Sequence, residues 1–235
     1  MEDIILKVKQ LGVSFGDLTV FNNLNFEVKR GETTAIIGPN GAGKTVLFRA
    51  LIGSIPYQGE VIWSKDAKIG YVPQRLDLDR HLSLNLGDFL KLKVKILGLP
   101  KIAIKEALNL AHLPIAKINN PLGYLSAGEL QRALIAHALI GSPGVLLFDE
   151  PTAGVDLPGE EQIYQTLHHL QDIKHLTLIF ISHDLNLVYR YAQKVICLNR
   201  AMFCFGTPKE TFTPQVLDKL YGSKVLHHLH QEDGF

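Results

Sequence analysis

Residues 38–45 read Gly38-Pro39-Asn40-Gly41-Ala42-Gly43-Lys44-Thr45, and this stretch decides the fold. It fits the pattern G-x-x-x-x-G-K-S/T, in which glycines allow backbone amides to wrap a chain of phosphates. The apolar segment 34–37 before it predicts a strand, and apolar residues at helical spacing from 46 to 50 predict a helix after it. A strand, a glycine-rich turn and a helix N-terminus together predict a phosphate-binding loop, which we call the phosphate loop.

Four side chains suit the chemistry of a bound nucleotide. Lys44 is expected to reach the β- and γ-phosphates, and Thr45 to offer its hydroxyl to Mg²⁺. Asp149 ends the apolar segment Val145–Phe148 and is placed to hold the same ion, directly or through water. Glu150 follows and can orient a water for attack on the γ-phosphate, whereas a plain strand cap would explain only one of the two acids. The sequence therefore predicts a site that binds a nucleoside triphosphate with Mg²⁺ and hydrolyses its γ-phosphate.

The segments around the loop predict an α/β fold. Apolar and polar residues alternate over 4–15 and 21–28, which predicts antiparallel strands joined by a turn at Gly16-Asp17. Residues 84–122 have helical spacing broken at Pro100 and Pro114, which favours an inserted helical subdomain. From residue 130 onward the pattern alternates helix and strand, ending with a strand over 177–181 and a helix from Asp184. We expect a mixed, mainly parallel core sheet with an N-terminal antiparallel subdomain.

Composition narrows the class of protein. Apolar residues make up 46% of the 235 residues and the formal net charge is +1, so neither disorder nor a nucleic-acid partner is expected. The longest apolar runs are about five residues, far short of the roughly 20 that span a bilayer. The acidic start Met1-Glu2-Asp3 does not match a signal peptide, and we expect a cytoplasmic protein.

The chain has two cysteines, Cys197 and Cys204. They flank the turn-prone residues 199–201, which could place them near each other in a hairpin. Because disulfides rarely persist in a reducing cytosol, we expect two reduced, packed thiols.

Residues Leu125-Ser126-Ala127-Gly128-Glu129, followed by Gln131-Arg132, resemble the signature motif Leu-Ser-Gly-Gly-Gln of the ATP-binding subunits of ABC transporters. The resemblance covers nearly the whole chain. It implies a P-loop NTPase fold of the ABC type, with 1–235 as a single ATPase domain and 84–142 as its inserted helical subdomain. Ala127 and Glu129 depart from the family's glycine and glutamine. Read from the residues alone, Ser126 and Glu129 also predict a capping box at a helix start.

The resemblance further implies roles around the nucleotide. Ser126, Ala127, Gly128 and Glu129 would contact the ATP held by the phosphate loop of a second copy, in a head-to-tail homodimer. Gln74 would touch Mg²⁺ or the attacking water, although a solvated loop glutamine is the alternative. His183 would donate a hydrogen bond to the γ-phosphate.

Two more family positions have a competing interpretation. Asp156 matches a loop that couples the two ATP sites of the dimer, or it simply caps the helix that Pro158 opens. Phe15 occupies the place where the family stacks a ring on adenine. Because Leu11, Val13 and Phe15 share one strand face, a core role is the alternative.

The resemblance implies a peripheral ATPase subunit on the inner face of the cell membrane. Its partners would be separate permease subunits and, indirectly, an extracytoplasmic substrate-binding protein. The stretches 69–75 and 77–80, with Gly128-Glu129, resemble the zinc and manganese importer subfamily.

The histidines His227, His228 and His230 lie in the expected C-terminal tail, 223–235, and imidazoles suit zinc or manganese. A histidine-rich terminus without a ligand is the alternative. For the whole protein, the alternatives are an ABC ATPase for another substrate and a non-transport ATPase associated with DNA or ribosomes.

Overall fold

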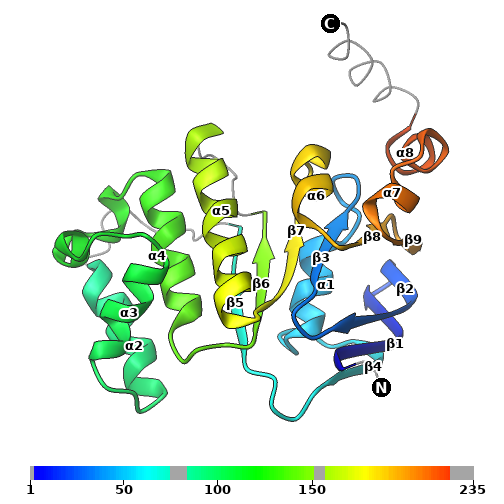
Figure 1. The fold of residues 1–235 in the computed structure, drawn as a ribbon. Coiled ribbons are helices and arrows are strands. Elements are labelled where there is room, and N and C mark those ends of the chain that lie inside the picture. The colour runs from blue at the N-terminus through cyan, green and yellow to red at the C-terminus, as the bar shows by residue number, and fades with distance from the viewer. Residues whose placement is uncertain (1–2, 75–83, 151–156, 223–235) are drawn as a thin grey trace, which may run out of the picture. The chain divides into compact units, whose positions relative to one another are not determined.

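The computed structural model describes residues 3–74, 84–150 and 157–222. The chain divides into two compact units, the first formed by Met1–Asp66 with Ile179–Phe235 and the second by Ala67–Leu178. The strands and helices are coloured along the chain in Figure 1. The strands are β1 (Ile4–Phe15), β2 (Leu18–Lys29), β3 (Thr33–Ile37), β4 (Gln58–Trp63), β5 (Ile69–Val72), β6 (Val145–Asp149), β7 (Thr177–Ile181), β8 (Lys194–Leu198) and β9 (Met202–Gly206). The helices are α1 (Lys44–Leu51), α2 (Leu86–Ile96), α3 (Ile102–Leu110), α4 (Ala127–Leu139), α5 (Leu157–Lys174), α6 (Leu185–Tyr191), α7 (Pro208–Thr211) and α8 (Pro214–Tyr221), with 3-10 turns at Ile115–Asn119 and Leu122–Tyr124.

An antiparallel sheet in the first unit has the strand order β2-β1-β4. Phe15 pairs with Leu18, so the β1–β2 turn is the predicted Gly16-Asp17. Val8, Leu11 and Val13 of β1 are almost fully buried, and the register with β2 shifts between Val8 and Leu11. The alternation in the sequence therefore predicted the antiparallel pairing of these two strands.

The first unit also contains the strand that leads into the phosphate loop. All five residues of β3 are buried, and β3 pairs in parallel with β8, which pairs antiparallel with β9. Parallel strands that lack polar alternation are typical of a sheet covered on both faces. The parallel and antiparallel pairings confirm the expected mixed α/β fold.

In the second unit, β5 and β6 pair in parallel, with Val72 opposite Phe148. Helices α2, α3 and α4 pack together, and they form the green group in Figure 1. The predicted breaks are present, because α2 ends before Pro100 and α3 ends before Pro114. Among the described residues, no helix is long and apolar enough to cross a membrane.

The cysteine prediction was wrong. Cys197 and Cys204 lie directly opposite each other on β8 and β9, and a disulfide joins them. Their Cα atoms are 4.8 Å apart, within the roughly 4.4–6.8 Å that a disulfide requires. The expectation of free thiols rested on cell compartment alone, whereas the hairpin register brings the two sulfur atoms together.

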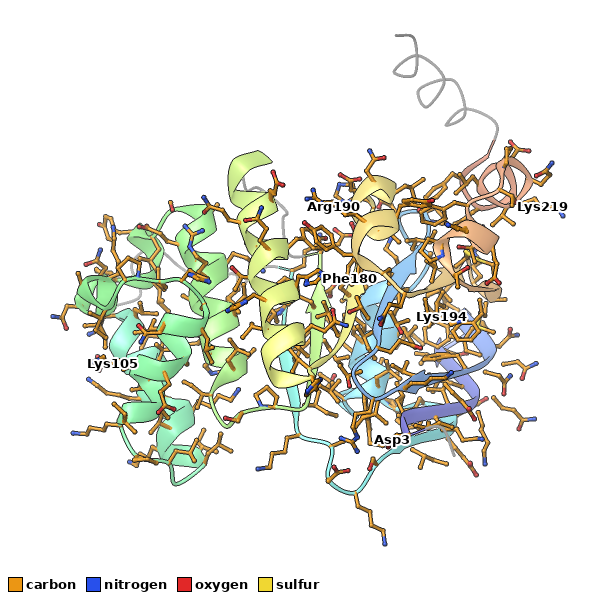
Figure 2. All side chains as sticks on the ribbon, viewed as in Figure 1. Asp3, Lys105, Phe180, Arg190, Lys194 and Lys219 are labelled. Carbon is orange, nitrogen blue, oxygen red and sulfur yellow. A yellow bond between two sulfur atoms is a disulfide. The ribbon has the colours of Figure 1, made fainter. Side chains whose placement is uncertain are left out.

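Side-chain placement follows polarity. Phe180, on β7, is fully buried, whereas the exposed Lys105 extends from α3 (Figure 2). In the first unit, Arg30 forms ion pairs with Asp3 at 2.8 Å and with Asp66 at 3.0 Å. The carboxylates of these pairs are largely exposed, so the pairs add little to stability.

Candidate functional site

The phosphate loop follows β3 and approaches its neighbours closely at two glycines. A Cβ atom on Gly38 would lie 2.0 Å from the carbonyl oxygen of Leu198, and one on Gly43 would lie 2.7 Å from Val20. Gly43 also has a φ of 94°, a left-handed value that disfavours other residues. Gly38 is therefore required by the backbone that it approaches, and Gly43 by its φ angle and by the Val20 side chain.

Lys44 is the first residue of α1, and its ammonium group lies inside the loop. Its Nζ donates to the carbonyl oxygens of Gly38 at 2.8 Å and Pro39 at 3.1 Å. Gly43 is the N-cap of α1 and supplies no side chain, and the first turn carries no acidic residue. Thr45 follows as the second residue of α1. The helix N-terminus and the ammonium group thus concentrate positive charge where an anion can bind.

Two further predicted residues belong to the same unit. His183 follows the end of β7, and its side chain is exposed. The amide of the preceding Ser182 donates to Ile36 of β3 at 3.4 Å, which places His183 beside the strand that leads into the phosphate loop. Phe15 is 49% exposed at the end of β1, so the alternative core role is wrong, and adenine stacking stays a prediction.

Asp149 ends β6 in the second unit and is only 1% exposed. The hydroxyl of Tyr71, on β5, donates to Asp149 Oδ2 at 3.3 Å. Tyr71 pairs with Leu147 in the parallel register, so its strand runs beside the one that carries Asp149. The sequence alone did not identify Tyr71. Parallel pairing of β5 with β6 would have pointed to it, because that pairing places Tyr71 beside the strand that ends in Asp149.

The side chains of Glu150 and Gln74 lie next to each other. The side-chain amide of Gln74 donates to Glu150 Oε2. Glu150 has a φ of 43°, a left-handed value that is uncommon for a residue with a side chain. Strain of this kind clusters at functional sites, where it fixes the direction of a side chain.

The signature segment forms the predicted capping box at the start of α4. The Glu129 amide donates to Ser126 Oγ at 3.2 Å, and the Ser126 amide donates to Glu129 Oε2 at 2.9 Å. Ser126 and Ala127 are exposed, and Gly128 is half-buried. The N-terminus of α4 is therefore a capped, exposed helix end.

The sequence did not identify Lys117 as a partner of Glu129. Lys117 Nζ lies 2.8 Å from Glu129 Oε1. The hydrogen bond with Lys117, followed by that with the Ser126 backbone, lowers the pKa of Glu129. The extra negative charge that Glu129 brings to the signature motif is thus held in an ion pair.

The donor atoms suit Mg²⁺, which prefers hard oxygen ligands. Thr45 offers a hydroxyl and the buried Asp149 a carboxylate. For a transition metal, the described residues contain no group of three or more His, Cys, Asp or Glu that could hold an ion. Asp156 and the histidines His227, His228 and His230 lie outside the described residues.

A family model described as "ABC transporter" matches residues 21–153. The zinc import ATP-binding protein ZnuC of Photorhabdus laumondii is 37% identical over 234 residues, covering 97% of this chain and 90% of that protein. The match extends from the N-terminal strands beyond the signature segment to the C-terminal helices.

Two solved structures have the same fold. An inward-facing ABC transporter assigned to the metal-chelate type matches with a TM-score of 0.84 and 26% identity, over 93% of this chain and 89% of that one. The dimeric bacterial ABC transporter cassette MJ0796 matches with a TM-score of 0.75 and 25% identity, over 87% of this chain and 99% of that one. These likenesses cover both units of the chain.

Proposed function

The chain belongs to the ABC transporter family as an ATP-binding subunit, and from that premise we propose that its ATPase activity powers import of a divalent metal ion, zinc or manganese, with zinc favoured. The 37% identity to a zinc import ATPase over nearly the full chain is the observation that carries the choice of metal. The metal ion is cargo of the assembled transporter and not a resident cofactor of this chain.

The phosphate loop would bind the triphosphate of ATP. Lys44 already donates to two loop carbonyls, and these contacts would be exchanged for β- and γ-phosphate oxygens when ATP enters. The amides at the N-terminus of α1 add further donors. Thr45 and Asp149 would hold the magnesium ion that neutralises phosphate charge when bound.

Hydrolysis would depend on Glu150. Its carboxylate would orient a water toward the γ-phosphate and accept a proton from it. The Gln74 amide, which donates to Glu150 Oε2, would hold the carboxylate in its direction until the water is placed. The exposed His183 would donate a hydrogen bond to the γ-phosphate.

The active form would be a head-to-tail homodimer. The related cassette MJ0796 is dimeric, which supports a dimer. The exposed N-terminus of α4, capped by Ser126 and Glu129, would face the ATP bound by the phosphate loop of the second copy. Phe15 would stack on adenine, and Asp156 would couple the two sites. The dimer would dock on permease subunits at the inner face of the membrane, with a substrate-binding protein delivering metal on the far side.

Transport can be tested with the complete complex. The tagged chain would be purified from membranes of its source cells with its bound membrane subunits and placed in proteoliposomes. We expect vesicles that contain ATP to accumulate zinc, or manganese, when the matching binding protein is added outside. Accumulation of neither metal, together with ATPase stimulation by an unrelated solute, would contradict the proposal. The Lys44→Ala complex is the control for ATP dependence.

A further inference from the structure

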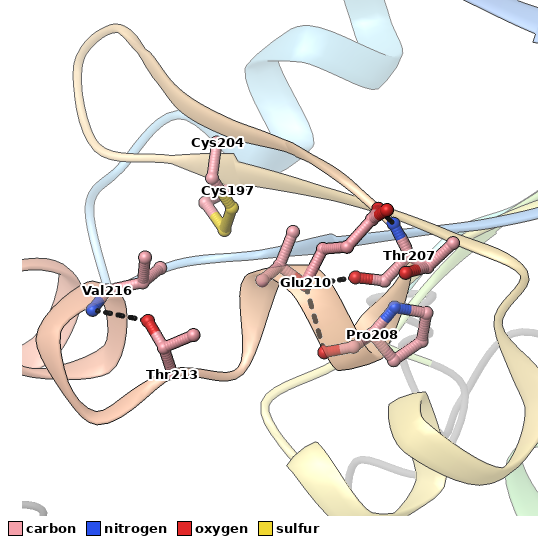
Figure 3. Close-up of a disulfide and its surroundings, with 8 residues drawn as sticks. Cys197, Cys204, Thr207, Pro208, Glu210, Thr213 and Val216 are labelled. Atoms are coloured by element: carbon pink, nitrogen blue, oxygen red, sulfur yellow. Dashed lines mark hydrogen bonds between the residues drawn. A yellow bond between two sulfur atoms is a disulfide. The ribbon is translucent and has the colours of Figure 1, made fainter.

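A disulfide joins Cys197 on β8 to Cys204 on β9 (Figure 3). Cys197 on β8 is 0% exposed, whereas Cys204 on β9 is half-buried. Beyond β9, the Thr207 amide donates to Glu210 Oε2 at 2.7 Å in a capping box of α7, which anchors that end of the hairpin. At the other end, the Asn199 amide donates to the carbonyl of Ala201 at 3.0 Å and closes the turn. The disulfide thus spans the hairpin between two fixed ends.

The hairpin touches the first residue of the phosphate loop. Cys197 pairs with Ile37 in the parallel register of β8 and β3, and Ile37 directly precedes Gly38. Gly38 packs against the backbone of the next residue on β8, because a Cβ atom there would lie 2.0 Å from the Leu198 carbonyl oxygen. Ile37 and Leu198 are both 0% exposed. In such a closely packed region, a shift of the β8 backbone must move the loop.

We propose that Cys197 and Cys204 form a thiol–disulfide exchange site for small cytosolic thiols, and that its redox state sets the affinity of the phosphate loop for ATP. The inference rests on the proposed binding of ATP by this loop. The exchange site makes ATP binding depend on the redox state of the surroundings. Binding and hydrolysis of ATP do not themselves require such a dependence.

The difference in exposure between the two cysteines decides which sulfur atom is attacked first. A small thiolate attacks the Sγ of the half-buried Cys204, the bond between the two cysteines breaks, and Cys197 leaves as a thiolate that takes up a proton. A second small thiolate attacks the outer sulfur of the mixed disulfide and releases Cys204, which is protonated in turn. Overall, one protein disulfide and two small thiols react to give two protein thiols and one small disulfide. Two electrons and two protons are transferred to the protein. Oxidation by the small disulfide is the reverse.

The direction of coupling follows from the contact at Leu198. With the disulfide formed, β9 holds β8 in place, and β8 supports Gly38 from behind. Reduction removes the link, so ATP must order a less constrained loop when it binds, and this ordering opposes binding. We expect the dissociation constant for ATP to be at least about threefold larger for the reduced protein.

The experiment uses the full chain in buffers of fixed ratio of reduced to oxidised glutathione. Free thiols are trapped with N-ethylmaleimide and counted by intact mass, which is simple because the chain has two cysteines. Affinity for a non-hydrolysable ATP analogue is measured by calorimetry in the same buffers. Cys204→Ser is the matched control, because it prevents the disulfide at a half-buried position. Cys197→Ala is a second variant that also leaves one thiol.

The expected result is conversion between two and zero trapped thiols, with weaker analogue binding in the reduced state. Both variants should bind as the reduced wild type does and should not respond to glutathione. Equal affinity in the two trapped states would overturn the coupling. A thiol count that does not change with the glutathione ratio would overturn the exchange site. Absence of analogue binding in every state would instead overturn the proposed function.

Discussion

We predict that the folded protein loses stability in mild acid because His137 is largely buried. Its ring stacks on Phe89 of α2, with the ring centres 4.5 Å apart. Burial, with a smaller contribution from the charge of Lys93, lowers the pKa of His137 from 6.5 to about 4. Lys93 is held there because its Nζ donates to the carbonyl oxygens of His137 at 2.7 Å and Ala138 at 3.3 Å, near the end of α4.

The lowered pKa fixes the sign and size of the effect. Between pH 6.5 and pH 4 the unfolded chain binds a proton at His137 that the folded chain does not, so unfolding becomes more favourable as pH falls. Above pH 6.5 His137 is uncharged in both the folded and the unfolded chain, so the free energy of unfolding keeps its full value there. With a folded pKa of about 4, lowering the pH from 7 to 5 removes about 2 kcal/mol from the free energy of unfolding.

The assay is urea unfolding followed by circular dichroism at pH 7 and pH 5, for the wild type and for His137→Phe. Phenylalanine keeps a ring against Phe89 but does not titrate, so the variant should lose about 2 kcal/mol less than the wild type over this interval. Other titrating groups are common to both proteins and cancel in the difference. An equal pH dependence in the two proteins would refute the burial argument for His137.

Tyr71→Phe removes the donor to Asp149 Oδ2, and we expect the Mg²⁺ concentration needed for half-maximal ATP binding to rise about tenfold; an unchanged Mg²⁺ titration would show that the hydroxyl does not orient the carboxylate. Lys117→Met leaves the charge of Glu129 uncompensated, so ATP-driven dimerisation measured by size-exclusion chromatography should weaken, and adding Glu129→Gln should restore it. Failure of the double variant to recover would exclude charge as the cause. Truncation after Val225 should keep basal ATPase activity and abolish calorimetric zinc binding by the tail, which should itself weaken below a pH of about 6.5 as imidazoles protonate; zinc binding equal to that of the full chain would remove the tail as a metal site.

Local patterns in the sequence predicted much of the fold and part of the site. The phosphate loop and the capping box of Ser126 and Glu129 each depend on residues within one short segment, so spacing alone identifies them. Glu150 was predicted from its position after the apolar strand that ends in Asp149, whereas Gln74 came from the family resemblance, and the structure joins the two by a hydrogen bond.

The features that were missed depend on register and on packing between distant segments. Tyr71 meets Asp149 because β5 and β6 pair in parallel, and propensity does not encode that pairing. The disulfide between Cys197 and Cys204 follows from the register of the hairpin, and an argument from the cell compartment could not predict it. The contact between Lys117 and Glu129 joins a 3-10 turn to a helix start, and neither segment predicts it alone.

ATP turnover by Glu150→Gln tests the central claim most directly, because that claim assigns the attacking water to this carboxylate. The variant, the wild type and Lys44→Ala would be compared for ATP affinity and for phosphate release in single-turnover experiments. Glu106→Gln, at an exposed position of α3, is the matched carboxylate control. We expect Glu150→Gln to bind ATP nearly as the wild type does while phosphate release falls at least about 100-fold, and Lys44→Ala to lose both. Phosphate release by Glu150→Gln at the wild-type rate would contradict the account.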